Sequence, residues 1–103
     1  MEFFFEKELL NDNIYNLLKK IGYHFIGKNQ KKSEIVFNRP LERNRYPRFH
    51  LYLKINEDRI IFNLHLDQKK PSYKGSPAHS AEYEGKIVEN EAERIKEICN
   101  IEN

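Results

Sequence analysis

The spacing of apolar residues predicts a helix near each end of the chain. In LLNDNIYNLLKKI, residues 9–21, apolar side chains recur every three or four positions, and Gly22 follows where a helix is expected to end. Residues 87–99 contain a second apolar stripe of the same spacing. Glu89 and Glu91 come early in this segment, where the helix dipole favours negative charge. Both segments therefore predict amphipathic helices that cover a core.

Between these segments the pattern changes to the short runs and two-residue period of β-strands. YHFIG (23–27) and EIVFNR (34–39) are β-branched and aromatic runs joined by polar residues. RFHLYLKI (48–55) and RIIFNLHLD (59–67) alternate on either side of a short polar turn. The connection RPLERNRYP that precedes them contains two prolines, which excludes it from a central strand. The four runs predict two consecutive hairpins.

The order of the elements predicts an α+β fold in one domain that spans residues 1–103. Four strands form an antiparallel β-meander, and the two helices pack on one of its faces in the order α-β-β-β-β-α. A chain of 103 residues has no room for a second domain. Residues 68–85 contain Pro71 and Pro77 and show no sustained period, so they predict a long ordered loop.

Composition and the N-terminal sequence indicate the compartment. No apolar run approaches the length of a membrane span, and the first ten residues are acidic where a signal peptide is basic. Cys99 is the only cysteine, so no internal disulfide forms. We therefore expect a soluble cytoplasmic protein that does not contact a membrane.

The alternation of the 48–67 hairpin specifies its register. A two-residue turn at Glu57 and Asp58 pairs Ile55 with Ile60 and puts the apolar residues of both strands on one face. A slip by one residue would put polar side chains into that layer. The residues that we expect in the core are Phe49, Leu51, Leu53, Phe62, Leu64 and Leu66.

The same register gathers polar side chains on the opposite face of the hairpin. There the expected cross-strand pairs are Arg48 with Asp67, His50 with His65, and Tyr52 with Asn63. Directly opposed residues have Cβ atoms about 4.5–5.5 Å apart. Two imidazoles at that separation can share one divalent metal ion, or act as acid and base on one phosphate, with Tyr52 and Asn63 in support.

A site for zinc or another divalent transition metal is the first interpretation of this constellation. His50 and His65 would be joined by His79 if the 68–85 loop folds back across the face, with Asp67 as a ligand or as the residue that orients an imidazole. Three ligands and an open fourth position are typical of catalytic zinc sites, so hydrolysis is compatible with the same residues. The pattern does not specify which face His24 occupies, and we assign it a structural role.

The charge distribution favours a second interpretation, binding of a nucleic acid or another polyanion. The net charge is only +2, but residues 19–74 contain fourteen basic and five acidic residues, while both ends of the chain are acidic. The side chains that such a partner would contact are Arg43, Arg45, Arg48, Lys69, Lys70 and Lys74. Tyr46 and Tyr52 lie nearby and are suited to base stacking.

A third interpretation is a phosphodiester enzyme that needs no metal. His50 and His65 would then act as general base and general acid, because an imidazole titrates near physiological pH. The sequence does not favour serine-centred hydrolysis, since the serines of the 68–85 segment lack a G-x-S-x-G context. The pattern leaves open whether the protein is an enzyme or a binding module, and it says nothing about the oligomeric state.

Three stretches of the chain also resemble other proteins. PRFHLYLK, FNLHLDQKKPSYKG and AHSAEYEG are similar to segments of a set of small prokaryotic proteins of about this length that have no assigned function. The resemblance covers residues 46–96, about half of the chain. It implies no activity and identifies no catalytic residue, so the candidate chemistry depends on the strand pairing alone.

Overall fold

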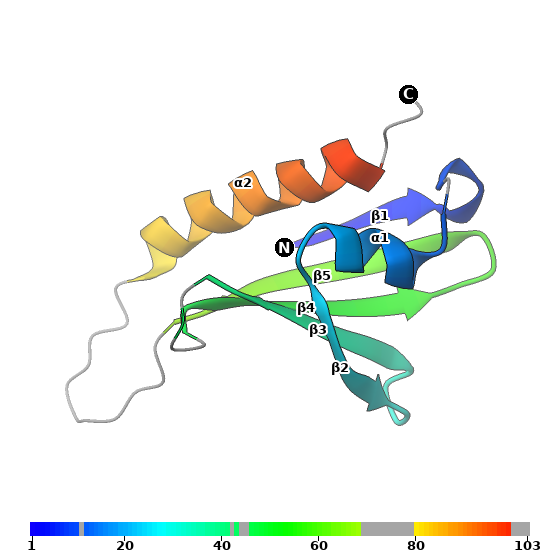
Figure 1. Ribbon diagram of the computed structural model, residues 1–103, viewed down its shortest axis with the longest axis horizontal. Coiled ribbons are helices and arrows are strands. Elements are labelled where there is room, and N and C mark those ends of the chain that lie inside the picture. The colour runs from blue at the N-terminus through cyan, green and yellow to red at the C-terminus, as the bar shows by residue number, and fades with distance from the viewer. Residues whose placement is uncertain (11, 42, 44–45, 69–79, 100–103) are drawn as a thin grey trace.

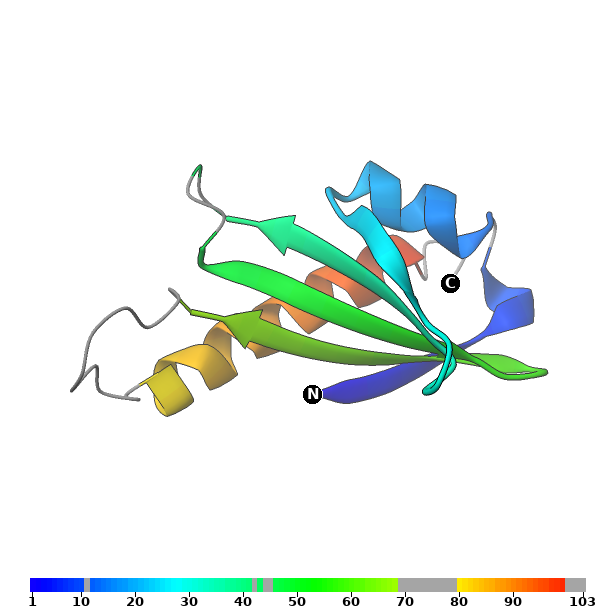
Figure 2. The same cartoon turned by 90° about the horizontal axis from the view of Figure 1, so that it is seen from below.

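A five-stranded antiparallel sheet with two helices on one of its faces makes up the fold, which is α+β as predicted. The structure is a computed structural model, which describes residues 1–10, 12–41, 43, 46–68 and 80–99. In sheet order the strands are β1 (Glu2–Glu6), β5 (Arg59–Asp67), β4 (Arg48–Ile55), β3 (Glu34–Pro40) and β2 (His24–Asn29). The helices are α1 (Ile14–Lys20) and α2 (Ser80–Cys99), with a 3₁₀ turn, η1 (Lys7–Leu9), after β1. Figures 1 and 2 show both helices on the same side of the sheet.

The expectation of four strands missed β1, which pairs with β5 at one edge of the sheet. Phe3 and Phe5 pack against the core, whereas Phe4 points to the other face, where the guanidinium carbon of Arg59 lies 4.3 Å from its ring centroid. Because three consecutive residues are phenylalanine, the sequence of β1 does not show the alternation of apolar and polar residues that predicts a strand. Only the pairing with β5 shows that two of the rings face inward.

The first helix is shorter than predicted. It begins at Ile14 instead of residue 9, because Asn13 caps it: the backbone N–H of Asn16 donates to Oδ1 of Asn13 at 2.9 Å. The expected glycine does follow the helix end. Gly22 has φ +100°, a conformation that other residues rarely adopt, and a Cβ there would lie 3.2 Å from Nε of Arg39.

The second helix is longer than predicted. It ends at Cys99 as expected but begins at Ser80, so residues 80–85 of the predicted loop are helical. Residues 69–79 of that predicted loop lie outside the described residues. No helix in the described part of the chain is long and apolar enough to cross a membrane.

The predicted register of the β4–β5 hairpin is confirmed. Ile55 pairs with Ile60, and the backbone N–H of Asn56 donates to the carbonyl of Arg59 at 2.9 Å around Glu57 and Asp58. One apolar residue of the hairpin does not face the core. Ile61 pairs with Lys54, and its side chain lies on the opposite face of the sheet. All six residues that were expected in the core are buried: Phe49, Leu51, Leu53, Phe62, Leu64 and Leu66.

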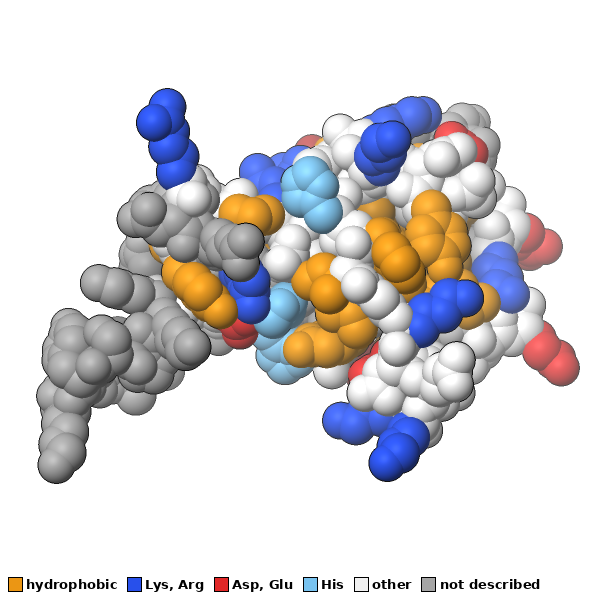
Figure 3. Space-filling view, turned by 60° about the horizontal axis from the view of Figure 1, so that its bottom comes forward, with side chains coloured by type: hydrophobic (Ala, Val, Ile, Leu, Met, Phe, Trp, Pro, Cys, Tyr) orange, Lys and Arg blue, Asp and Glu red, His pale blue; other side chains and the backbone are white. Residues whose placement is uncertain are grey.

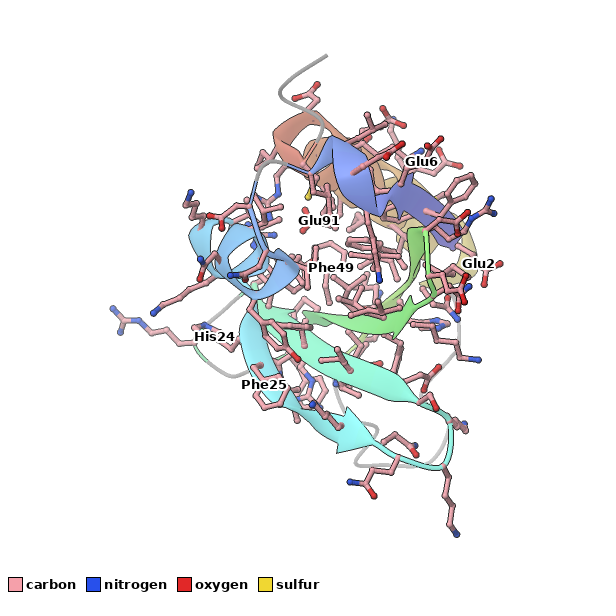
Figure 4. The ribbon with its side chains drawn as sticks, turned by 90° about the vertical axis from the view of Figure 1, so that its right-hand side faces the viewer. Glu2, Glu6, His24, Phe25, Phe49 and Glu91 are labelled. Carbon is pink, nitrogen blue, oxygen red and sulfur yellow. The ribbon has the colours of Figure 1, made fainter. Side chains whose placement is uncertain are left out.

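A buried carboxylate joins α2 to the rest of the molecule. Glu91 is 5% exposed and accepts a hydrogen bond from the hydroxyl of Tyr23 at 2.6 Å and two from the guanidinium of Arg94 at 2.9 Å. Arg39 of β3 lies 3.4 Å from the same carboxylate, and Arg94 also donates to the carbonyl of Ile21 at 2.8 Å. Figure 4 shows Glu91 and Phe49 in the interior between the helices and the sheet.

Candidate functional site

The sheet face away from the helices carries most of the described residues of the predicted site. One row of cross-strand partners runs through His24, Asn38, His50 and His65, from β2 to β5. Figure 3 shows histidine, basic and hydrophobic side chains on this surface. We call it the open face, and its side chains come from Glu2, Phe4, Glu6, His24, Asn29, Glu34, Val36, Asn38, Pro40, Arg48, His50, Tyr52, Lys54, Arg59, Ile61, Asn63, His65 and Asp67.

Asp67 contacts the first of the two predicted imidazoles. Its Oδ2 lies 2.5 Å from Nδ1 of His50 and 3.5 Å from Nε of Arg48. The exposed fractions of the three side chains are 34% for Asp67, 17% for His50 and 20% for Arg48. A carboxylate this close to Nδ1 favours the neutral tautomer that carries its hydrogen on that nitrogen. In that tautomer the free lone pair of His50 is on Nε2.

Burial decides the protonation of His50. It lowers the pKa of His50 below the ordinary value of 6.5, while Asp67 raises that pKa and the charges of Arg48 and His65 lower it. His50 is consequently neutral at pH 7 and accepts a proton readily only at Nε2. Such an imidazole is suited to act as a general base or as a metal ligand.

Tyr52 lies beside both imidazoles. Its ring centroid is 5.8 Å from that of His50 and 5.7 Å from that of His65, and the His65 contact is edge-to-face. Burial and the carboxylates of Asp67 and Glu34 raise the pKa of Tyr52, so its phenol keeps its proton at neutral pH. His65 is exposed. The three rings thus form one cluster with His50 partly buried and His65 at the surface.

A hollow in the open face adjoins this cluster. Its volume is about 630 Å³, and it extends from β5 toward the turn between β2 and β3. Its lining is mainly polar and consists of Asn29, Lys32, Glu34, Tyr52, Asn63, His65, Leu66 and Asp67. Both Tyr52 and Asn63, which we expected to support the imidazoles, therefore line a space large enough for a small ligand.

The described residues do not assemble three metal ligands. Among them, no group of three His, Cys, Asp or Glu side chains is placed to hold a metal ion. Asp67 contacts Nδ1 of His50, which fits the orienting role that we expected for it better than direct ligation. His79 lies outside the described residues, so a site formed by His50, His65 and His79 stays a prediction.

The predicted basic surface is only partly described. Arg48 is not free, because it pairs with Asp67 and its guanidinium carbon lies 4.5 Å from the ring centroid of Tyr46. Arg43 is exposed in the connection between β3 and β4. The remaining members of the set lie outside the described residues: Arg45, Lys69, Lys70 and Lys74.

His24 is the open-face histidine that the sequence pattern did not place. The register of the β2–β3 pair shifts between Phe25 and Gly27, which marks a β-bulge. If the pairing of Asn29 with Glu34 continued along β2 without a bulge, His24 would lie opposite Arg39, and its side chain would point to the core. The bulge pairs it with Asn38 and turns it to the open face. Gly27 was the available signal, since a glycine inside a strand often accompanies a bulge.

Comparison with known proteins assigns no family, since no family model, no curated protein and no solved structure matches the chain. The resemblance of residues 46–96 to small prokaryotic proteins stays a prediction.

Proposed function

We propose that the open face is the active site of a phosphodiester-cleaving enzyme in which His50 is the general base and His65 the general acid. The observation that carries this proposal is the 2.5 Å contact between Asp67 and Nδ1 of His50. A buried or half-buried carboxylate at one imidazole nitrogen fixes the tautomer and leaves the other nitrogen to accept a proton. A histidine that only filled space on a sheet would not need that partner.

The position of His65 supports the second half of the proposal. His50 and His65 are direct cross-strand partners on β4 and β5. Their Cβ atoms are therefore about 4.5–5.5 Å apart, which lets both imidazoles reach one phosphate group. His65 is the more exposed of the two, so it can exchange its proton with water between turnovers.

An aryl phosphodiester that carries its own hydroxyl group, 2-hydroxypropyl p-nitrophenyl phosphate, provides the direct test. The wild-type protein should release p-nitrophenol in the presence of a chelator. His50→Gln and His65→Gln should each lower the rate by about 10²–10⁴-fold, the usual contribution of general acid–base catalysis. Asp67→Asn should also lower the rate, because an amide no longer fixes the hydrogen on Nδ1. His24→Gln is the matched control, since it changes an exposed histidine in the same row two strands away.

Two results would overturn the proposal. One is a wild-type rate no higher than that of the His50→Gln variant. The other is an equal loss in His24→Gln, which would trace the effect to the surface of the face and not to the imidazole pair.

Binding of zinc or another divalent transition metal by the same imidazoles is the second candidate function. The contact that favours it is again that of Asp67 with Nδ1 of His50, because metal-bound histidines commonly donate a hydrogen bond from their other ring N–H to a carboxylate. Calorimetric titration of untagged protein with Zn²⁺ tests it. His79→Ala should weaken binding more than His24→Ala, because His79 supplies the third ligand. Equal effects of the two substitutions would contradict a three-histidine site.

A further inference from the structure

The hollow beside the imidazoles has the chemistry of a nucleobase pocket. It combines two carboxamides, Asn29 and Asn63, with the carboxylate of Glu34 and the ring of Tyr52. Carboxamides and carboxylates pair with the donor and acceptor edges of bases, and aromatic rings stack on their faces. Lys32 at the rim adds a positive charge for a phosphate. A purely apolar ligand would leave these polar groups without partners.

The hollow and the imidazole pair are parts of one site. His65 and Asp67 line the hollow, and the ring of Tyr52 lies within 6 Å of both imidazole centroids. A base stacked on Tyr52 therefore places the phosphate of its own nucleotide near His50 and His65. A base in such a pocket must be unpaired, which selects a single strand over a duplex.

We propose that the substrate of this site is single-stranded RNA, with one base in the hollow against Tyr52 and the 2′-hydroxyl of that nucleotide as the nucleophile. This inference rests on the proposed acid–base function of His50 and His65. It adds the substrate class and the source of the attacking oxygen.

The identity of the nucleophile follows from the side chains of the open face. At its described positions the face carries one hydroxyl group, the phenol of Tyr52, which keeps its proton at neutral pH. Because the described residues of the open face include no serine, threonine or cysteine, the acid–base pair suits a substrate that brings its own hydroxyl group. The 2′-hydroxyl of RNA lies next to the phosphate to be cleaved, and DNA lacks it.

The proposed step balances with two proton transfers. Nε2 of neutral His50 takes the proton of the 2′-hydroxyl while O2′ forms a bond to phosphorus. The bond from phosphorus to O5′ breaks, and O5′ receives a proton from the imidazolium of His65. The products are a 2′,3′-cyclic phosphate and a 5′-hydroxyl end, and water then returns the two histidines to their starting protonation.

Matched oligonucleotides test the inference. The probes are a single-stranded RNA of mixed sequence, the DNA of the same sequence and the fully 2′-O-methylated RNA, each incubated with the full chain and a chelator. Only the RNA should be cleaved, and mass spectrometry should find 2′,3′-cyclic phosphate ends. Cleavage should disappear in His50→Gln.

Variants of the hollow provide a second readout. Tyr52→Leu should raise KM for RNA by roughly 5- to 150-fold, the loss expected for one base–aromatic stack, with a smaller change in kcat. Tyr52→Phe keeps the stacking ring and should keep KM close to that of the wild type. Phe4→Leu is the matched control, because Phe4 is an exposed aromatic residue of the open face that does not line the hollow. Circular dichroism checks that each variant folds.

The outcomes separate this inference from the proposed function. If the aryl phosphodiester is cleaved in a His50-dependent way and RNA is not, or if DNA and 2′-O-methyl RNA are cleaved as fast as RNA, the substrate assignment is wrong and the acid–base function stands. If neither the aryl ester nor RNA is cleaved, the acid–base function itself fails. A Tyr52→Leu variant that folds and keeps its KM would overturn the base pocket.

Discussion

At the scale of single residues, Glu91 is expected to contribute strongly to stability. Its carboxylate is buried and partnered by Tyr23, Arg94 and Arg39, so Glu91→Ala leaves the cations and the hydroxyl group without their acceptor. We expect the free energy of unfolding to fall by about 3–5 kcal/mol, the usual result of breaking a buried ion pair. Urea denaturation measures the change.

The neighbouring acid Glu93 is the control for this prediction. It lies on the same helix, with a side chain that is 70% exposed and 3.7 Å from Lys96. Exposed pairs of this kind contribute about 0–1 kcal/mol. Glu93→Ala should therefore change the stability little, and an equal loss in the two variants would contradict the role of the Glu91 network.

His50 makes the stability depend on pH. In the folded protein, burial lowers the pKa of His50 below 6.5. Asp67 raises this pKa, and the charges of Arg48 and His65 lower it further. Below pH 6.5 the unfolded chain takes up a proton at this residue before the folded protein does, so the free energy of unfolding falls. The contribution of neutral His50 to the free energy of unfolding is fully present above pH 6.5. It is lost as the pH falls from 6.5 through the lowered pKa of His50 in the folded protein.

The test compares wild type with His50→Gln, which does not titrate. The loss of stability between about pH 7.5 and about pH 5 should be smaller in the variant than in the wild type. A larger pH-dependent loss in His50→Gln would mean that the sign of the His50 contribution is wrong.

At the scale of elements, the β4–β5 hairpin supplies the middle of the core. Leu51 and Leu64 are direct partners, fully buried between the sheet and the helices. Leu51→Ala or Leu64→Ala should lower the free energy of unfolding by about 2–5 kcal/mol, because each leaves a cavity in a closely packed layer. Chemical denaturation measures this loss, and Ile55→Ala, at an exposed end of β4, should cost much less.

The edge strands show where pattern reasoning fails at this scale. The β4–β5 hairpin alternates polar and apolar residues, and its register follows from that alternation. β1 is a run of three phenylalanines between glutamates, and β2 contains a bulge after Phe25. In both strands the facing of the side chains is set by the neighbouring strand, so single-strand periodicity carries too little information to predict it.

At the scale of the whole molecule, one core connects all the main layers. The buried cluster contains residues of β1, α1, β3, β4, β5 and α2 in continuous contact. We therefore expect one cooperative unfolding transition, with the same midpoint by far-ultraviolet circular dichroism and by tyrosine fluorescence. Two separate midpoints would mean that part of the chain, such as α2, unfolds on its own.

The sequence alone determined the parts of the molecule in which local pattern and burial agree. These are the α+β class, the exact pairing of β4 with β5, and hence the placing of His50, His65, Tyr52, Asn63 and Asp67 on one face. A strand that buries one face cannot shift by one residue without exposing its apolar side chains, so its alternation specifies both faces at once.

Tertiary structure decided the features that depend on contacts between segments far apart in the chain. The sequence placed Glu91 early in a helix over residues 87–99, but the helix begins at Ser80, and Tyr23 and Arg39, from 68 and 52 residues away, make Glu91 a buried acceptor. The face of His24 was decided by a bulge, and the contact between Asp67 and Nδ1 of His50 by side-chain geometry. Periodicity records which side of an element is buried, whereas hydrogen-bond partners across the sheet are set only when the chain has folded.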